Sequence, residues 1–276
     1  MPAKLGILVV HGMGSQKDPH FADKMMEEVN GRVTELGLNA HDVAWQPVYW
    51  ADILEPQENA LWTKLTRNHK LGFAELRKFV LRNLADALAY QREPDCSPDV
   101  YERIHRRVHE GVIDLRSKLG GQDAPLAVMA HSPGSYVMSN YIWDQQRQNS
   151  AALPGPSAFE KMRTLCALIT FGCNIALFSL ALQNYVGITF PPLELKEPVK
   201  SAARWLNYYD PQDVLGYPVK PLWDGYASNP QIEDLEINVG NILTSWNPLS
   251  HVQYWTDDNF TGPVSRQIAS LLKAIP

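Results

Sequence analysis

Apolar runs of strand length recur along this chain, and stretches with helical periodicity separate them. Three runs are apolar throughout, which is typical of strands buried on both faces of a parallel sheet: Leu5–Val10, Leu126–Ala130 and Leu165–Phe171. The other strand candidates are Val43–Trp50, Trp205–Tyr209 and Leu235–Val239. The amphipathic stretches include Phe21–Leu36, Ser135–Gln148 and Val264–Lys273. This alternation predicts an α/β fold, with a mostly parallel central sheet and helices on both of its faces.

The composition of the chain limits which binding partners and which cellular compartment we expect for it. The chain has 276 residues and a net charge of −5, which argues against nucleic-acid binding because that function needs a basic footprint. Three cysteines, Cys96, Cys166 and Cys173, are too few and too scattered for a disulfide framework or a zinc site, and this usage suits a reducing compartment. The first apolar run begins at Leu5 and has no secretory cleavage site. We therefore expect a cytoplasmic protein that folds as a single domain over residues 1–276.

One uncharged stretch, Thr164–Leu193, is long enough to cross a bilayer. Gly172 and Asn174 interrupt this stretch, and Pro191–Pro192 closes it. Such punctuation favours a buried strand, a turn and a helix over a membrane span. We therefore predict no transmembrane segment.

The segment Ala130–Ser135 follows a buried strand and opens a helix. It places Ser132 between two small residues, Ala130 and Gly134. A serine on a sharp strand-to-helix turn adopts a strained backbone conformation that needs small neighbours, and its hydroxyl lies beside a helix N-terminus that favours negative charge. The same residues also suit an ordinary helix start, with Ser132 as the N-cap and Pro133 in the first turn.

Two loops near the end of the chain carry an acid and a histidine. Asp213 follows a late strand in the segment Tyr208–Val214. Asp210 is the alternative acid in this loop, although turn formation beside a proline also explains its presence. His251 lies in the segment Ser250–Trp255, shortly before the last predicted helix.

Taken in chain order, these segments resemble the α/β-hydrolase superfamily, and in particular its lipase-like and esterase-like serine hydrolases. Ala130–Gly134 is similar to the nucleophile elbow, and the order Ser132, Asp213, His251 is that of the superfamily. The resemblance extends over essentially the whole chain. It implies that Ser132 is the nucleophile, His251 the general base and Asp213 the acid that orients the base. It implies no metal and no cofactor.

A glycine turn at the end of the first strand resembles the oxyanion loop of the same superfamily. The sequence there is His11-Gly12-Met13-Gly14, and the resemblance implies that the backbone N–H of Met13, beside Gly12, stabilises the oxyanion. Glycines let the backbone approach a substrate oxygen closely. Taken alone, this segment is equally well explained as an ordinary glycine turn by which the chain leaves the strand.

Pro133 departs from the superfamily pattern. The second oxyanion donor is ordinarily the backbone N–H of the residue after the nucleophile, and proline has no N–H. Loss of one donor removes about 3 kcal/mol of transition-state stabilisation. Two functions are therefore open. The first is a carboxylic ester hydrolase, slowed by Pro133, that acts on a small-molecule ester. The second is a catalytically degenerate hydrolase-fold protein that serves as a binding or scaffold protein.

Residues Asp52–Gln122 separate two predicted strands by much more than a crossover helix requires. We expect a largely helical insertion. Within it, Thr63–Lys118 holds twelve Lys and Arg against eight Asp and Glu, a net charge of +4. One interpretation is a pair of solvated helices packed on the sheet. The other is a basic cap over the active site that selects an anionic or lipid-like substrate. His105 and His109, one helical turn apart, are predicted to lie on a solvated face.

Overall fold

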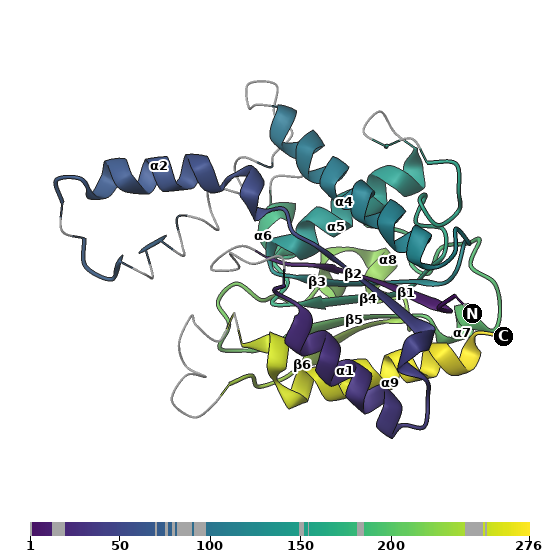
Figure 1. Cartoon of the computed structure of the whole chain (residues 1–276). Helices are drawn as coiled ribbons and strands as arrows, with labels where there is room; N and C mark the ends of the chain where they lie inside the picture. The colour runs from purple at the N-terminus through teal and green to yellow at the C-terminus, as the bar shows by residue number, and fades with distance from the viewer. Residues whose placement is uncertain are drawn as a thin grey trace.

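One six-stranded sheet forms the core of the protein in the computed structural model, which describes residues 2–12, 20–69, 71–74, 77–78, 81, 90, 98–148, 152–153, 155–180, 185–240, 251 and 253–276 (Figure 1). All neighbouring strands are parallel, in the order β2-β1-β3-β4-β5-β6. Their bounds are β1 Leu5–Val10, β2 Val43–Val48, β3 Leu126–His131, β4 Leu165–Phe171, β5 Arg204–Tyr209 and β6 Ile232–Glu236. Every residue of β1, β3 and β4 is buried, which explains their continuous apolar sequences. The predicted α/β class with a parallel sheet is confirmed.

Helices cover both faces of the sheet (Figure 1). On one face α1 (Asp23–Glu35) packs against α9 (Asp258–Ala274), and on the other α4 (Pro98–Lys118) packs against α5 (Pro133–Arg147). The shorter elements are α2 (Glu55–Thr66), α6 (Ile175–Ser179), α7 (Val199–Ala202), α8 (Asp224–Ala227), and the 3₁₀ turns η1 (Ala40–Asp42), η2 (Ala51–Ile53), η3 (Lys220–Leu222) and η5 (Tyr254–Thr256).

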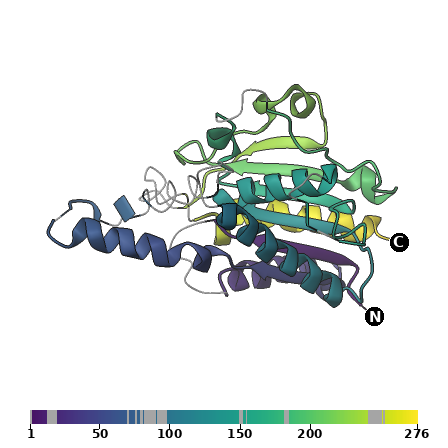
Figure 2. The ribbon, with the colours of Figure 1, turned by 90° about the horizontal axis from the view of Figure 1, so that it is seen from above.

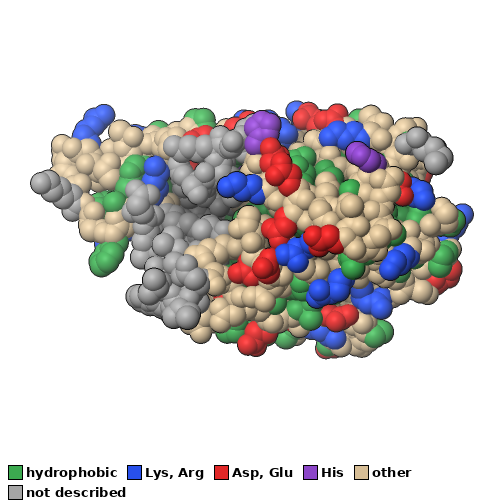
Figure 3. Space-filling view, turned by 60° about the horizontal axis from the view of Figure 1, so that its bottom comes forward, with side chains coloured by type: hydrophobic (Ala, Val, Ile, Leu, Met, Phe, Trp, Pro, Cys, Tyr) green, Lys and Arg blue, Asp and Glu red, His purple; other side chains and the backbone are tan. Residues whose placement is uncertain are grey.

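Acidic and basic side chains are interspersed on the face of the molecule that carries α1 and α9 (Figure 3). Arg32 on α1 shows the local pattern, because its guanidinium pairs with Glu28 one turn earlier at 2.9 Å and also with Asp258 at the start of α9. The pair of Arg32 with Asp258 connects the two helices across this face of the sheet.

The connections of the sheet make a topological switch point at the carboxyl ends of β1 and β3. From β1 the chain crosses by α1 to β2 on one side, and from β3 it crosses by α5 to β4 on the other side. The two neighbouring strands therefore send their helices to opposite faces. Open α/β sheets bind ligands outside the carboxyl ends of the strands at such a switch point. Ser132, the residue that follows β3, lies there.

The boundaries of β6 and α9 differ most from the sequence prediction, whereas those of the other predicted elements agree to within two residues. β6 begins at Ile232 rather than at Leu235, because this edge strand mixes acidic and apolar residues and is not marked by an apolar run. α9 begins at Asp258, ahead of the predicted Val264–Lys273, because the carboxylate of Asp257 caps it by accepting the N–H of Asn259.

The expected insertion at Asp52–Gln122 is shorter than predicted. α4 packs on β1 and β2 and serves as the ordinary crossover helix between β2 and β3. Ahead of it, α2 projects away from the body of the protein in both ribbon views, and among the described elements it contacts mainly η2 (Figures 1 and 2). Most of residues 70–97 lie outside the described part of the chain. The predicted basic cap over the active site would fall largely on these residues.

The prediction of a solvated face at His105 and His109 is wrong. Both side chains are buried between α4 and α5. His105 Nε2 bonds the hydroxyl of Tyr90 at 2.6 Å, and its Nδ1 lies 3.5 Å from Asp144 Oδ2. His109 Nδ1 bonds the hydroxyl of Tyr141 at 2.8 Å. Polar partners on the facing helix and loop allow these histidines to occupy a helix interface that the sequence pattern assigned to solvent.

The first half of the uncharged stretch Thr164–Leu193 holds β4, a turn and the short α6. Among the described residues, no helix is both long enough and apolar enough to cross a membrane.

Candidate active site

Ser132 lies on a strained turn between β3 and α5. Its backbone has φ 53° and ψ −130°, a region that residues with a side chain rarely occupy. Two glycines make room for the turn. A Cβ on Gly134 would lie 2.5 Å from the carbonyl oxygen of His11, and a Cβ on Gly12 would lie 2.5 Å from the Cβ of Ser132. The turn therefore depends on close packing against the end of β1.

Ser132, His251 and Asp213 form a continuous hydrogen-bonded chain. The Ser132 hydroxyl donates to His251 Nε2 at 2.5 Å, and the Nδ1–H of His251 donates to both carboxylate oxygens of Asp213, at 2.9 and 2.8 Å. All three side chains are buried. The imidazole can therefore take the serine proton while the carboxylate holds the ring and balances its charge.

Asp210, the alternative acid, lies elsewhere in the same loop and has a different role. Its Oδ1 accepts the N–H of Gln212 at 2.7 Å, and its Oδ2 accepts the N–H of Val239 at 2.8 Å. These bonds tie the loop after β5 to the chain after β6. The structure thus brings Asp213, and not Asp210, to His251.

Tyr254 holds the acid in place, and sequence analysis missed this function. Its hydroxyl donates to Asp213 Oδ2 at 3.0 Å and accepts the N–H of Asp210 at 2.9 Å. Burial raises the pKa of the Asp213 carboxyl, but the bond and charge of His251, with donors from Leu215 and Tyr254, lower the pKa below its ordinary value. The position of Tyr254, three residues after His251, was the available sequence signal.

His131, directly before the serine, supports the position of His251. Its Nε2–H donates to the backbone carbonyl of His251 at 2.7 Å, and the two rings lie 4.9 Å apart. Burial and the neighbouring His251 lower the pKa of His131 to about 3. The ring is therefore neutral at physiological pH, and its Nε2 carries the proton because the carbonyl can only accept.

His11 fixes the end of β1 beside the serine. Its Nε2 accepts the backbone N–H of Trp50 at 3.1 Å, and the indole N–H of Trp50 donates to the His11 carbonyl at 3.0 Å. The Nδ1 of His11 also contacts the carbonyl of Gly12. Burial lowers the pKa of His11 to about 4, so this ring is neutral too. Of the two residues expected in the oxyanion loop, Gly12 packs on Ser132, and Met13 lies outside the described residues.

The helix start after Ser132 has an unusual set of donors. Pro133 is the first residue of α5 and has no N–H. The N–H of Ser135 donates to the Ser132 carbonyl at 2.8 Å, whereas none of the described carbonyls accepts the N–H of Gly134. Gly134 is therefore the first backbone donor available at the positive end of this helix.

The histidines and the carboxylate beside Ser132 are not arranged as a metal site. Throughout the part of the chain that the structure describes, no three His, Cys, Asp or Glu side chains are placed to hold a metal ion. Cys173 is buried just after β4, and burial raises the pKa of its thiol to about 12, so it is not a reactive thiolate.

Comparison with known proteins adds no family assignment. No protein-family model matches the chain, and no curated protein matches it. The geometry around Ser132 is therefore the basis for assigning a function.

The buried neutral His131 predicts a specific pH dependence of stability. In the folded protein the pKa of His131 is about 3, below the ordinary value of 6.5. Between these two pH values the imidazole is therefore protonated in the unfolded chain and neutral in the folded protein. This contribution to stability is complete above pH 6.5 and is lost as the pH falls toward 3. Between pH 7.5 and 5, the wild type should lose about 2 kcal/mol more unfolding free energy than His131→Gln. Urea unfolding at both pH values measures this difference.

The exposed His41 provides the control for this measurement. A His41→Gln variant should follow the wild-type pH dependence, because its imidazole is not buried. Equal pH dependence in the wild type and in His131→Gln would show that His131 is protonated in the folded protein.

Proposed function

We propose that this chain is a serine hydrolase of the α/β-hydrolase fold that cleaves carboxylic esters. The observation that carries the proposal is the 2.5 Å contact of Ser132 Oγ with His251 Nε2, made from a turn with positive φ. The chain order supports it, because the serine follows β3, the acid Asp213 follows β5 and the histidine comes after β6, as in that superfamily. Esters are proposed over amides because lipase-like and esterase-like members act on esters.

The proposed reaction is acyl transfer to water. Ser132 Oγ attacks the ester carbonyl carbon while His251 takes the hydroxyl proton, and the resulting tetrahedral oxyanion collapses with cleavage of the bond to the alcohol oxygen. His251 gives its proton to that oxygen. Water then attacks the acyl-serine by the same route, which releases the carboxylic acid and restores Ser132. Asp213 orients the imidazole and stabilises the imidazolium throughout.

The oxyanion would be stabilised by backbone donors at the ends of β1 and β3. The N–H of Met13, next to Gly12, is the proposed first donor. Pro133 cannot supply the second, and the N–H of Gly134 with the positive end of α5 is the proposed substitute. A less well placed second donor predicts slow turnover, since one oxyanion donor contributes about 3 kcal/mol.

The proposed substrate is a small-molecule ester with an anionic or lipid-like group. Support for this comes from the net charge of +4 over Thr63–Lys118. A cytoplasmic location is also proposed, because Cys166 and Cys173 are free thiols.

A second candidate function is binding without catalysis. Two observations favour it: the side chain of Ser132 is 0% exposed, and Pro133 deprives the site of a standard oxyanion donor. In that case the hydrogen-bonded chain of Ser132, His251 and Asp213 would stabilise the fold without turning over an ester.

A fluorophosphonate probe separates the two functions. The activated Ser132 should form a covalent phosphonyl adduct, which intact-protein mass spectrometry detects as one added probe mass. Ser132→Ala should remain unlabelled. Ser135→Ala is the matched control and should be labelled like the wild type, because the Ser135 hydroxyl donates to the carbonyl of Ala130 and does not reach His251. Labelling of Ser132→Ala, or no labelling of the wild type, would exclude the hydrolase.

Pro133→Leu tests the missing donor. Leucine restores a backbone N–H where the oxyanion forms. It also removes the restriction that a following proline places on the backbone conformation of Ser132. For a slow hydrolase, kcat on a small activated ester should rise by roughly ten- to a thousandfold. KM should change much less, because the N–H donor stabilises negative charge that develops in the transition state and that the bound substrate lacks.

The rate of Ser132→Ala on the same ester sets the background for this comparison. An unchanged kcat in a normally folded Pro133→Leu protein would mean that another group already fills the oxyanion hole. A wild-type rate equal to the background, and not raised by leucine, would favour the binding protein.

A further inference from the structure

The helix α2 and the chain that follows it form an arm of residues 55–69, 71–74 and 77–78, which stands away from the sheet and its covering helices (Figures 1 and 2). Among the described elements, α2 contacts mainly η2, which precedes it directly in the chain. Beyond the first turn of α2, most of the described residues of the arm are exposed. The side chains of the arm are therefore presented to whatever lies outside the protein.

Large apolar side chains are among those that the arm exposes. Leu61 and Leu65 are each 41% exposed, and they lie one turn apart on the same face of α2. Phe73, after the helix, is 82% exposed. A single exposed apolar residue is ordinary, but three that are gathered on one projecting arm indicate an interaction surface.

The arm is also basic. Residues 59–78 contain five Lys and Arg and one Glu, a net charge of +4, so the rest of the chain carries −9. Basic and hydrophobic side chains lie side by side on the projecting part of the molecule, at the left of Figure 3. Positive charge is thus concentrated on the arm, whereas the body of the protein is acidic.

The positive side chains lie close to the apolar ones. On α2, Lys64 lies one turn after Leu61. After the helix, the backbone N–H of Arg77 donates to the carbonyl of Phe73 and its Nε–H donates to the carbonyl of Gly72, each at 2.9 Å. Within the described part of the chain, no carboxylate pairs with the side chain of Lys64 or of Arg77. Both cations are therefore available to an anionic partner that also offers apolar surface.

We propose that this arm docks on the surface of an anionic lipid membrane. Its lysine and arginine side chains would pair with the lipid headgroups, and Leu61, Leu65 and Phe73 would enter the boundary of the hydrocarbon. A second copy of the chain would instead bring two positive arms together. A single-stranded nucleic acid stacks on aromatic side chains, whereas two of the three apolar side chains here are leucines. The proposal does not depend on the chemistry of Ser132.

Co-sedimentation of the whole protein with lipid vesicles measures the docking. We expect binding to phosphatidylcholine vesicles that contain about one third phosphatidylserine, and binding at least roughly tenfold weaker to pure phosphatidylcholine, because the anionic lipid attracts the basic residues. Added salt should weaken the binding, since it screens exposed charges. Ser132→Ala should bind the vesicles as the wild type does, which separates docking from the proposed catalysis.

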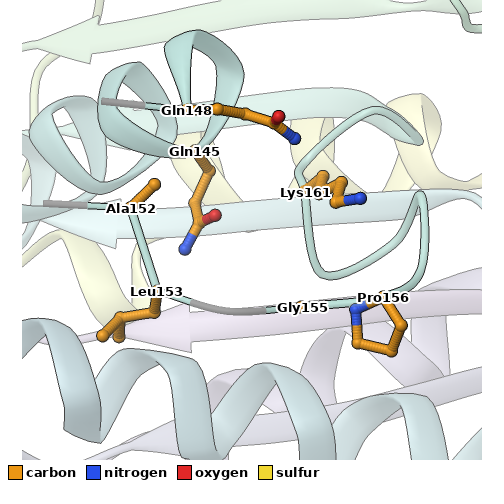
Figure 4. Close-up of a pocket in the computed structure, with 7 residues that line it drawn as sticks. All are labelled: Gln145, Gln148, Ala152, Leu153, Gly155, Pro156 and Lys161. Atoms are coloured by element: carbon orange, nitrogen blue, oxygen red, sulfur yellow. The ribbon is translucent and has the colours of Figure 1, made fainter. Parts of the chain in front are cut away.

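Removal of two cations tests the electrostatic part of the proposal. Lys64→Gln combined with Arg67→Gln should weaken binding to the anionic vesicles by roughly tenfold or more. The matched control, Lys161→Gln combined with Lys196→Gln, removes the same charge from the body of the protein and should bind nearly as the wild type does. Lys161 lines an open hollow at the end of α5, whose described lining includes no exposed leucine or aromatic side chain (Figure 4).

Removal of two apolar side chains tests the insertion into lipid. Leu65→Ser combined with Phe73→Ser should also weaken binding to the anionic vesicles by roughly tenfold or more. The control is Leu180→Ser combined with Leu193→Ser, which removes leucines that are 85% and 78% exposed elsewhere on the protein, and it should bind as the wild type does. Thermal unfolding confirms that each variant is folded.

Two results would overturn the proposal. One is the absence of vesicle binding by the wild type. The other is binding like that of the wild type by either arm variant. In particular, a loss of binding in the charge variant alone would mean that the arm attracts polyanions in general, such as an acidic protein, and does not enter lipid.

Discussion

The strained backbone of Ser132 is the constraint on which the rest of the site depends. A residue with φ 53° between a buried strand and a helix persists only if its surroundings fix it. The end of β1 does so, because Gly134 lies so close to the His11 carbonyl that a Cβ would not fit. The same packing directs the serine hydroxyl toward the carboxyl ends of the strands. Strands that are distant in sequence thus determine the conformation of one residue.

Buried polar groups then fix the partners of the serine. His131 holds the backbone of His251, and Tyr254 holds Asp213, so each member of the hydrogen-bonded chain is restrained by a neighbour outside it. Such a network is stabilising only when its members are satisfied, because unpaired polar groups in a low-dielectric interior are costly. The neutral state of His131, imposed by burial, belongs to this arrangement.

Much of the fold and of the candidate site could be predicted from the sequence, for identifiable reasons. β1 and β4 have the predicted bounds because strands buried on both faces are uninterrupted apolar runs. The predicted position of the edge strand β6 was shifted along the chain because acidic residues interrupt its apolar pattern. His105 was assigned to solvent because its partner Tyr90 comes from a segment whose position the sequence does not indicate. Residue types and chain order indicated Asp213, but its choice over Asp210 needed the loop geometry.

The distinction between the two aspartates gives the most direct test of the account. In the proposed mechanism Asp213 holds the His251 tautomer, so Asp213→Asn should lower kcat on an activated ester by roughly 10⁴-fold while the protein stays folded. Asp210→Asn should mainly lower stability, because its carboxylate accepts backbone N–H groups of Gln212 and Val239, and its kcat should stay within about tenfold of wild type. The measurement is kcat for both variants at one pH. A larger loss in Asp210→Asn, or wild-type turnover by Asp213→Asn, would contradict the mechanism.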